Sequence, residues 1–247
     1  MKNWSVTPKF LLRRDCVLFA SKTLPPGKFV EIGAGTGELT KAFLKRGYSG
    51  TCYDIGSVNR DTLRENLAVY GNDVVVANSL DDVPYNHFDY LLAFEVLEHI
   101  DDDLSALQDW RRYLKDGGVA IISVPSHMKK YGPTDKAVGH LRRYERDELT
   151  ALFRKAGFTD CRVHSYGFPL ANISSKLSNM IYSKKELSTE DHVSLSMRSG
   201  IERPKIVNLF QHLTKILVPP FVLLQRAFFS MDFGDGYVLT AKCKAKK

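Results

Sequence analysis

Hydrophobic and polar positions along the chain fall into two kinds of segment that alternate. Continuous apolar segments, which are typical of strands buried on both faces, occupy residues 28–32, 49–55, 73–77, 88–94, 119–125, 159–167 and 236–244. Apolar residues at helical spacing occupy residues 38–47, 59–71, 103–118 and 145–158. Strands that alternate with helices in this way predict a mainly parallel sheet with helices on both faces.

The stretch before the first strand predicts a separate helix. Thr7 can cap this helix and Pro8 suits its first turn, whereas Pro25, Pro26 and Gly27 end it. We therefore expect residues 1–27 to form an N-terminal segment in front of a core made of residues 28–166 and 232–247.

The last two predicted strands are separated by an insertion, residues 167–231. An insertion of this length is too long for a loop without structure in a compact domain. Its second half carries apolar residues at helical spacing, namely Ile206, Leu209, Phe210, Leu213 and Leu217. The pattern predicts a helical cap over the sheet edge, within a single domain that spans residues 1–247.

Polar and glycine-rich segments follow the ends of the predicted strands. They include GAGTG, Asp54, Asn78, residues 94–99 and residues 124–127. Right-handed crossovers bring the carboxyl ends of parallel strands to one edge of the sheet, where α/β proteins bind their ligands. We therefore expect one site along this edge.

Composition narrows the choice of partners only slightly. The formal net charge is +7 and the pI is about 9.1, which suits an anionic ligand, a nucleic acid or an acidic membrane surface without choosing among them. The four cysteines lie far apart, without metal-binding spacing, so we expect a reducing, cytoplasmic location. No signal-peptide pattern is present, and the apolar stretch 216–225 is too short to span a bilayer.

The glycine-rich turn GAGTG follows a strand and opens a helix. Its glycines are Gly33, Gly35 and Gly37, whereas the dinucleotide pattern GxGxxG would require a third glycine at Glu38. Glycines let the backbone adopt positive φ and approach a ligand. Asp54 lies 21 positions after Gly33, at the end of the second strand, which suits hydrogen bonds to a ribose.

Taken in order, these motifs resemble those of Rossmann-like, class I S-adenosylmethionine-dependent methyltransferases of the small-molecule branch. The resemblance covers residues 28–167 and 235–244 and rests on EIGAGTG, ANSLDD, FEVLEHI, LKDGGVAIISVP and GHLRRYERDELTALFRKAGF. It implies a doubly wound, seven-stranded sheet with an antiparallel last strand, and S-adenosylmethionine as cofactor. The cofactor-binding residues that it implies are Glu31, Gly33, Ala34, Gly35, Gly37, Asp54, Ile55, Asn78, Ser79, Leu80, Phe94 and Glu95.

Methyl transfer needs an aligned nucleophile, exclusion of water and, for an oxygen or nitrogen of high pKa, a base. The candidate catalytic residues are His140, His127, Glu98 and His99. Arg142, Arg143 and Tyr144 are candidates for holding an anionic group of the acceptor, or else form a solvated turn that opens a helix.

The segment FEVLEHIDDD allows two interpretations. In the simpler one, Phe94 and Glu95 line the pocket, and Asp101–Asp103 favour the start of the next helix. In the other, Glu95, Glu98 and His99 bind a divalent cation together with His140. That set is similar to the metal-binding residues of plant small-RNA 2′-O-methyltransferases and of some ubiquinone-pathway O-methyltransferases. We assign no metal ligand from the sequence, and the two interpretations remain open.

The sequence is compatible with three functions. The leading one is O-methylation of a small-molecule or biosynthetic-intermediate acceptor, because the cap would enclose such a substrate. An RNA methyltransferase fits the charge, but no appended RNA-binding module is recognisable. A third is a membrane-surface or partner-binding protein with an inert methyltransferase fold, because ILVPPFVLL with nearby Lys and Arg residues could lie at an interface.

Overall fold

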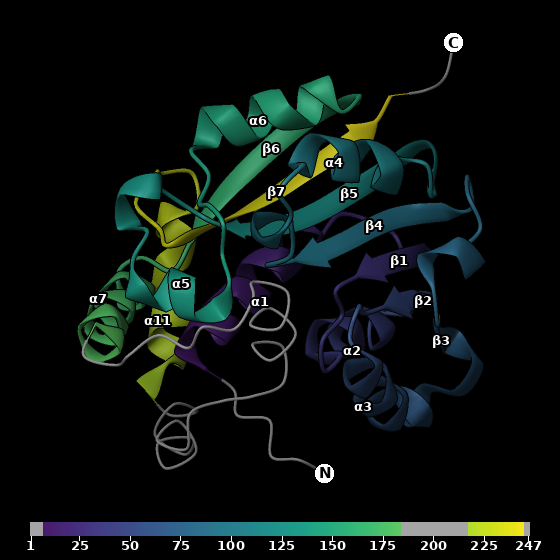
Figure 1. Ribbon diagram of the computed structural model, residues 1–247, viewed down its shortest axis with the longest axis horizontal. Coiled ribbons are helices and arrows are strands. Elements are labelled where there is room, and N and C mark those ends of the chain that lie inside the picture. Colours follow the sequence, from purple (N-terminus) through teal and green to yellow (C-terminus); the bar gives the residue numbers. More distant parts are fainter. Residues whose placement is uncertain (1–6, 184–216, 245–247) are drawn as a thin grey trace.

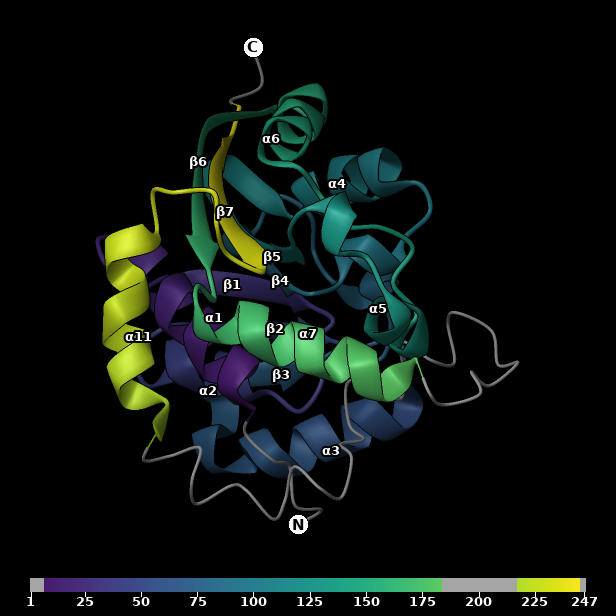
Figure 2. The ribbon, with the colours of Figure 1, turned by 90° about the vertical axis from the view of Figure 1, so that its left-hand side faces the viewer.

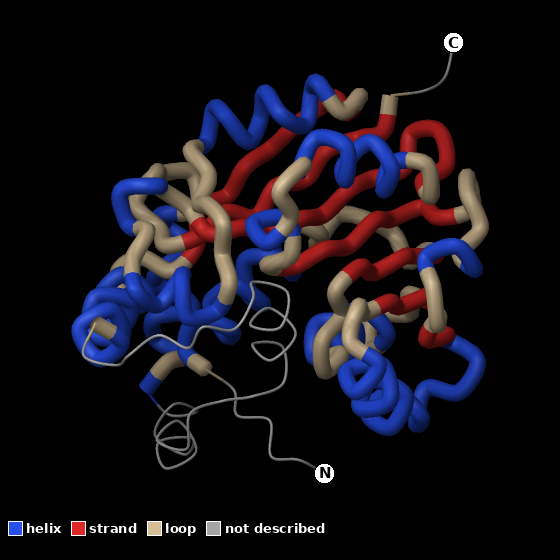
Figure 3. The backbone as a smooth tube through the Cα atoms, in the orientation of Figure 1, coloured by secondary structure: helices blue, strands red, loops and turns tan. Residues whose placement is uncertain are grey.

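The computed structural model describes residues 7–183 and 217–244, and these form one seven-stranded sheet with helices on both faces (Figures 1 and 3). The strand order is β3-β2-β1-β4-β5-β7-β6, and β7 is antiparallel to both of its neighbours. The strands are β1 (Lys28–Ile32), β2 (Ser49–Tyr53), β3 (Val74–Val76), β4 (Phe88–Phe94), β5 (Leu114–Pro125), β6 (Phe158–Tyr166) and β7 (Gly236–Cys243). The predicted mainly parallel sheet with an antiparallel last strand is confirmed.

Two apolar cores lie on opposite faces of this sheet. The first packs β4 residues such as Leu91 against α4 (Asp103–Arg111) and α6 (Arg146–Lys155). The second packs the adjacent β4 residue, Leu92, against α1 (Pro8–Ala20), α2 (Glu38–Leu44) and α3 (Ser57–Leu67). Neighbouring side chains of a strand point to opposite faces, so a continuous apolar strand supplies both cores.

Local signals in the sequence explain the starts of α1 and α4. The Thr7 hydroxyl accepts a hydrogen bond from the Phe10 amide, and Pro8 occupies the first turn of α1, as predicted. Asp102 caps α4 by accepting from the Ser105 amide. The predicted helix 103–118 is wrong in its second half, because α4 ends at Arg111 and residues from Leu114 onward already pair with β4.

The described parts of the insertion are helical. They are α7 (Leu170–Tyr182), α11 (Pro219–Gln225) and the 3-10 helix η5 (Arg226–Phe228). The helical spacing from Ile206 to Leu213 lies outside the described residues. Figure 2 shows α7 crossing beside α1 and α5 (Pro133–Val138), a short helix that the sequence analysis missed. Within the described ranges, no helix combines the length and the apolar character needed to cross a bilayer.

Gln225 joins the end of the insertion to the N-terminal helix. Its side-chain amide donates to the Leu12 carbonyl (2.9 Å) and to Asp15 (3.2 Å), while its oxygen accepts from the Gly167 amide (3.0 Å). Arg226 also pairs with Asp15. The two ends of the insertion and α1 are therefore fastened at one buried residue.

Candidate functional site

A cavity of about 710 Å³ opens at the carboxyl ends of β1, β2 and β4. Segments from α1, α5 and α7 form its other walls. The candidate site residues from the sequence that line it are Glu31, Gly33, Ala34, Gly35, Asp54, Ile55, Leu80, Phe94, Glu95, His99, His140 and Arg143. Most of the predicted cofactor residues and two of the catalytic candidates thus share one chamber.

The glycine-rich turn meets the cavity through its first two glycines. Gly33 has φ +71°, and a Cβ atom there would lie 2.4 Å from a methyl carbon of Val96, so no side chain fits. Gly37 is not part of the lining. A Cβ atom at Gly37 would lie 2.7 Å from Leu63, so this glycine lets α2 and α3 pack closely.

Asp54 holds this turn in place and also borders the cavity. Its carboxylate accepts hydrogen bonds from the Gly35 amide (2.9 Å), the Gly56 amide (3.2 Å) and the Asn59 side chain (2.8 Å). The residue is only 6% exposed. Asp54 therefore fixes the backbone of the glycine turn, in addition to the ribose role predicted for it.

The predicted adenine-flanking segment is only partly at the cavity. Leu80 and Ile55 line it, but Asn78 and Ser79 do not. The Asn78 side chain is exposed and accepts a hydrogen bond from Arg64 (2.6 Å). Ser79 caps the 3-10 helix η2 (Leu80–Asp82). The structure therefore brings the apolar members of this set to the cavity.

Glu31 lies at the floor of the cavity, 2% exposed. Burial raises its pKa to about 7, although a hydrogen bond from the Thr40 hydroxyl opposes that rise. Near neutral pH this carboxyl group therefore exists as a mixture of its neutral and ionised forms.

Glu95 has the opposite character. Its backbone has φ +58°, and its carboxylate accepts from the Ser123 hydroxyl (3.1 Å) and the Tyr166 hydroxyl (3.0 Å). Burial alone raises its pKa, but the charges of Lys9 (3.8 Å) and Arg13 (3.6 Å) outweigh burial and hold that pKa at about 2. Glu95 is therefore a permanent anion at this end of the cavity.

Lys9 and Arg13 were not predicted as site residues. Both lie on α1 and line the cavity. The Arg13 Nε is buried and has no hydrogen-bond partner among the described residues. The sequence signal was weak, because a basic residue on a predicted helix gives no indication of where that helix crosses the sheet.

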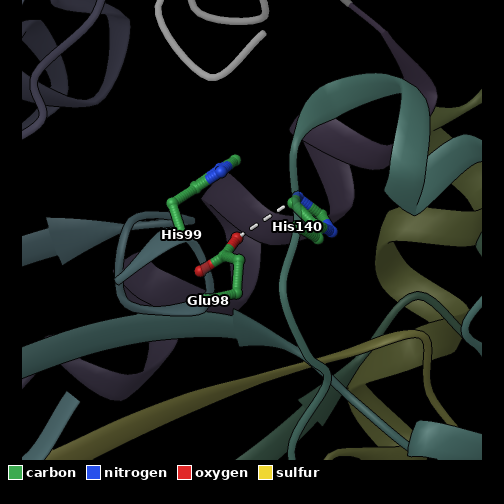
Figure 4. Close-up of side chains that lie close together, drawn as sticks. All are labelled: Glu98, His99 and His140. Atoms are coloured by element: carbon green, nitrogen blue, oxygen red, sulfur yellow. Dashed lines mark ion pairs between the residues drawn. The ribbon is translucent and has the colours of Figure 1, made fainter. Parts of the chain in front are cut away.

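Glu98, His99 and His140 converge on one point beside the cavity (Figure 4). One ligand atom from each lies within 4.8 Å of the others. The His99 Nδ1 lies 2.9 Å from the Gly139 carbonyl oxygen, and the His140 Nε2 lies 3.6 Å from a Glu98 oxygen. Among the described residues, neither oxygen of the fully buried Glu98 has a hydrogen-bond partner.

The burial of the Glu98 carboxyl without a hydrogen bond among the described residues has a direct electrostatic consequence. Burial and the nearby charge of Glu95 raise the pKa of Glu98 well above its ordinary value. A buried carboxylate without a partner is costly, so such a group becomes neutral or acquires a cation. The donor set of one carboxylate and two imidazoles therefore fits a divalent cation, although Glu95 is turned away toward Lys9 and Arg13.

A series of buried ion pairs begins at the Nδ1 atom of His140, on the other side of the ring from Glu98. The His140 Nδ1 lies 2.8 Å from Asp135, whose carboxylate also accepts from Arg143 (2.9 Å). Arg143 continues to Asp235 (3.2 Å), which pairs with Lys9 (3.0 Å). Burial raises the pKa of Asp135, but the His140 hydrogen bond and the Arg143 charge lower it to about 2. Asp135 was missed because the short helix α5 was missed.

His127 lies outside the cavity lining, as Glu98 does, but unlike Glu98 it does not approach the other catalytic candidates. It is buried with φ +63°, and its Nδ1 lies 3.1 Å from Glu145. Its ring also packs edge-on against Tyr237. These contacts connect the end of β5 with α6 and β7, away from the other two histidines.

Comparisons with known proteins agree with this geometry. The profile of a family described as "Methyltransferase domain" matches residues 10–163, which is more than half of the chain. A ubiquinone biosynthesis O-methyltransferase of Pseudomonas aeruginosa is 30% identical over 108 residues, covering 42% of this chain and 46% of its own length. The chain thus spans about half the length of this curated relative.

Solved structures share the fold at lower sequence identity. A Thermotoga maritima protein described as an S-adenosylmethionine-dependent methyltransferase, possible histamine N-methyltransferase, has a TM-score of 0.57 at 20% identity. The similarity covers 96% of this chain and 92% of that one. The cyclase SpnF has a TM-score of 0.60 at 18% identity, covering 100% and 85% of the two chains. These likenesses establish the fold alone.

Proposed function

The chain belongs to the methyltransferase domain family of Rossmann-like, S-adenosylmethionine-dependent enzymes, and on that premise we propose that it methylates an oxygen of a small-molecule acceptor. The observation that supports this proposal most is that one cavity joins the glycine turn and Asp54 to His140. Such a chamber can align a cofactor and an acceptor while it excludes water, which supplies much of the rate in methyl transfer.

The cofactor end would bind S-adenosylmethionine through groups that are already fixed. When bound, the cofactor supplies an electrophilic methyl group on its sulfonium. Asp54 would bind the ribose hydroxyls, since a carboxylate has more acceptor positions than the three hydrogen bonds that it already accepts. Arg13, with its buried and unpartnered Nε, would hold the cofactor carboxylate.

The acceptor end would provide the base. Because Asp135 is a permanent anion and accepts only, it keeps the proton of a neutral His140 ring on Nδ1. The Nε2 atom is then left unprotonated on the side of Glu98 and the cavity. His140 would take the acceptor hydroxyl proton at Nε2, and Asp135 would be its positioning residue.

The test is binding followed by turnover. Calorimetry should give dissociation constants for S-adenosylmethionine and S-adenosylhomocysteine near the micromolar range, on the order of −8 kcal/mol. Release of S-adenosylhomocysteine with a panel of hydroxylated acceptors then measures methyl transfer. A purified protein that binds neither cofactor form would refute the proposal.

A second candidate mechanism is favoured by the cluster of Glu98, His99 and His140. These side chains would hold a divalent cation such as Mg²⁺ or Mn²⁺. When bound, such a cation supplies positive charge that lowers the pKa of an acceptor hydroxyl. His140 would then be a ligand through Nε2, with Asp135 fixing its orientation.

Chelation separates the two mechanisms. With a cation, EDTA should abolish turnover and Mn²⁺ should restore it, while S-adenosylhomocysteine still binds. Calorimetric titration of the protein with Mn²⁺ should also show one site that is lost in Glu98→Gln. Full activity after exhaustive chelation would leave His140 as a metal-free base.

A further inference from the structure

Helix α7 forms one wall of the cavity, and it turns its polar side rather than its apolar side toward that cavity. The side that lines the cavity is polar and consists of Ser174, Ser175, Ser178 and Asn179. Three apolar residues of the same helix are not part of the lining and are 58–65% exposed, namely Ile173, Leu177 and Met180. A surface helix ordinarily turns its apolar side inward, so here the cavity wall carries the hydroxyl and amide groups instead.

The polar wall continues from α7 onto α5. The Asn179 side-chain oxygen accepts from the Thr134 amide (3.0 Å), which fixes α7 against the first turn of α5. Thr134 also lines the cavity, and its buried hydroxyl has no hydrogen-bond partner in the described part of the chain. This hydroxyl is an independent indication that a polar group belongs at the wall, because buried polar atoms in folded proteins are almost always paired.

Charges near this wall are already balanced within the protein. Lys9 lies 3.0 Å from Asp235, and Arg143 lies between Asp235 and Asp135. Arg13 faces Glu95 (3.6 Å). The cations therefore leave little excess charge to select an anionic group at α7. Serine and threonine hydroxyls both donate and accept, which suits neutral hydroxyl groups.

We propose that the acceptor carries a neutral, hydroxyl-rich portion, such as a sugar or polyol, which lies against Ser174, Ser178 and Thr134. This inference rests on the proposed function, since it names the substrate class of the same cavity. The Ser174 hydroxyl donates to the Ala171 carbonyl (3.0 Å) and keeps its capacity to accept. An apolar chain in that position would remove the Ser178 and Thr134 hydroxyls from water without replacing their hydrogen bonds, which is unfavourable.

Two probes with the same reacting ring test the proposal. One is 2-(3,4-dihydroxyphenyl)ethyl glucoside, and the other is 4-octylcatechol. Calorimetry on the protein saturated with S-adenosylhomocysteine should show the glucoside binding at least about ten-fold more tightly. The comparison uses the unaltered protein, so it does not depend on whether any variant folds.

Matched variants locate the effect on α7. Ser174→Leu and Ser178→Leu together should remove the preference for the glucoside, whereas Leu177→Ser on the exposed side should keep it. Equal or tighter binding of 4-octylcatechol, or no binding of either probe, would overturn the inference. Cofactor affinity and methyl transfer, measured in parallel, decide the proposed function separately, so the two failures are distinguishable.

Discussion

The two ends of the cavity are built in different ways. At the end that we propose holds the cofactor, the turn from Gly33 to Gly35 and Asp54 come from adjacent strands, β1 and β2. At the end that we propose holds the acceptor, side chains arrive from α1, α5, α7 and the segment after β4. The first end depends on local chain geometry, and the second depends on how distant segments pack. One fold can therefore keep its cofactor site while its acceptor site changes.

The largest expected effect separates the acceptor end from the rest of the protein. His140→Ala should lower kcat by about 10²- to 10⁴-fold, the usual contribution of a general base, and leave S-adenosylhomocysteine affinity within about two-fold. His127→Ala is the matched control, because His127 is a buried histidine outside the cavity. Its kcat should stay within about three-fold of wild type after correction for folded protein. Equal losses in the two variants would remove the catalytic assignment.

The second effect belongs to the cofactor end. Asp54→Ala should weaken S-adenosylhomocysteine binding by about 1.5–3 kcal/mol, because ribose contacts and the support of the Gly35 amide are lost together. Asp61→Ala, an exposed aspartate on the neighbouring α3, is the control and should not change the affinity. Calorimetry measures both. An unchanged affinity in Asp54→Ala would show that the carboxylate serves the fold alone.

The third effect concerns the pH dependence of stability at the cavity floor. Glu31 has an ordinary pKa near 4.5 and a pKa of about 7 in the folded protein. The folded state therefore binds more protons between these values, and the free energy of unfolding falls as pH rises from 4.5 to 7. Glu31→Gln should flatten this fall by up to about 3 kcal/mol.

Urea unfolding of the wild type and Glu31→Gln at pH 5 and pH 8 measures that difference directly. Other titrating groups are common to both proteins, so only the difference between the two pH profiles matters. Parallel profiles would mean that Glu31 ionises in the folded protein at its ordinary pKa.

The sequence located the parts of the cavity that follow local chain geometry better than the parts that depend on packing between distant segments. Periodicity and glycine spacing report local backbone geometry, so Gly33 and Asp54 were found together with the strands that carry them. Arg13 and Asp135 reach the cavity because of where α1 and α5 lie, and no local pattern encodes that packing. In the sequence, His127 and His140 were equal candidates, because both come after the strand 119–125 and no local pattern distinguishes them.

Some local motifs also had more than one use. Gly37 belongs to the glycine pattern, but its missing side chain makes room for Leu63 rather than for a ligand. The LKDGG segment looked like a helix end, but pairing with β4 begins at Leu114 and draws it into β5. In both cases a tertiary contact decided between two conformations or roles that the local sequence permits.

The late position of β7 in the sequence determines the order in which parts of the fold become available during synthesis. β6 pairs only with β7 among the described strands, and Gln225 must reach the Leu12 carbonyl across 213 positions. At typical synthesis rates, roughly 10–40 s pass between the emergence of these two residues. The glycine turn and Asp54 therefore leave the ribosome before α5 and α7, which form other walls of the same cavity.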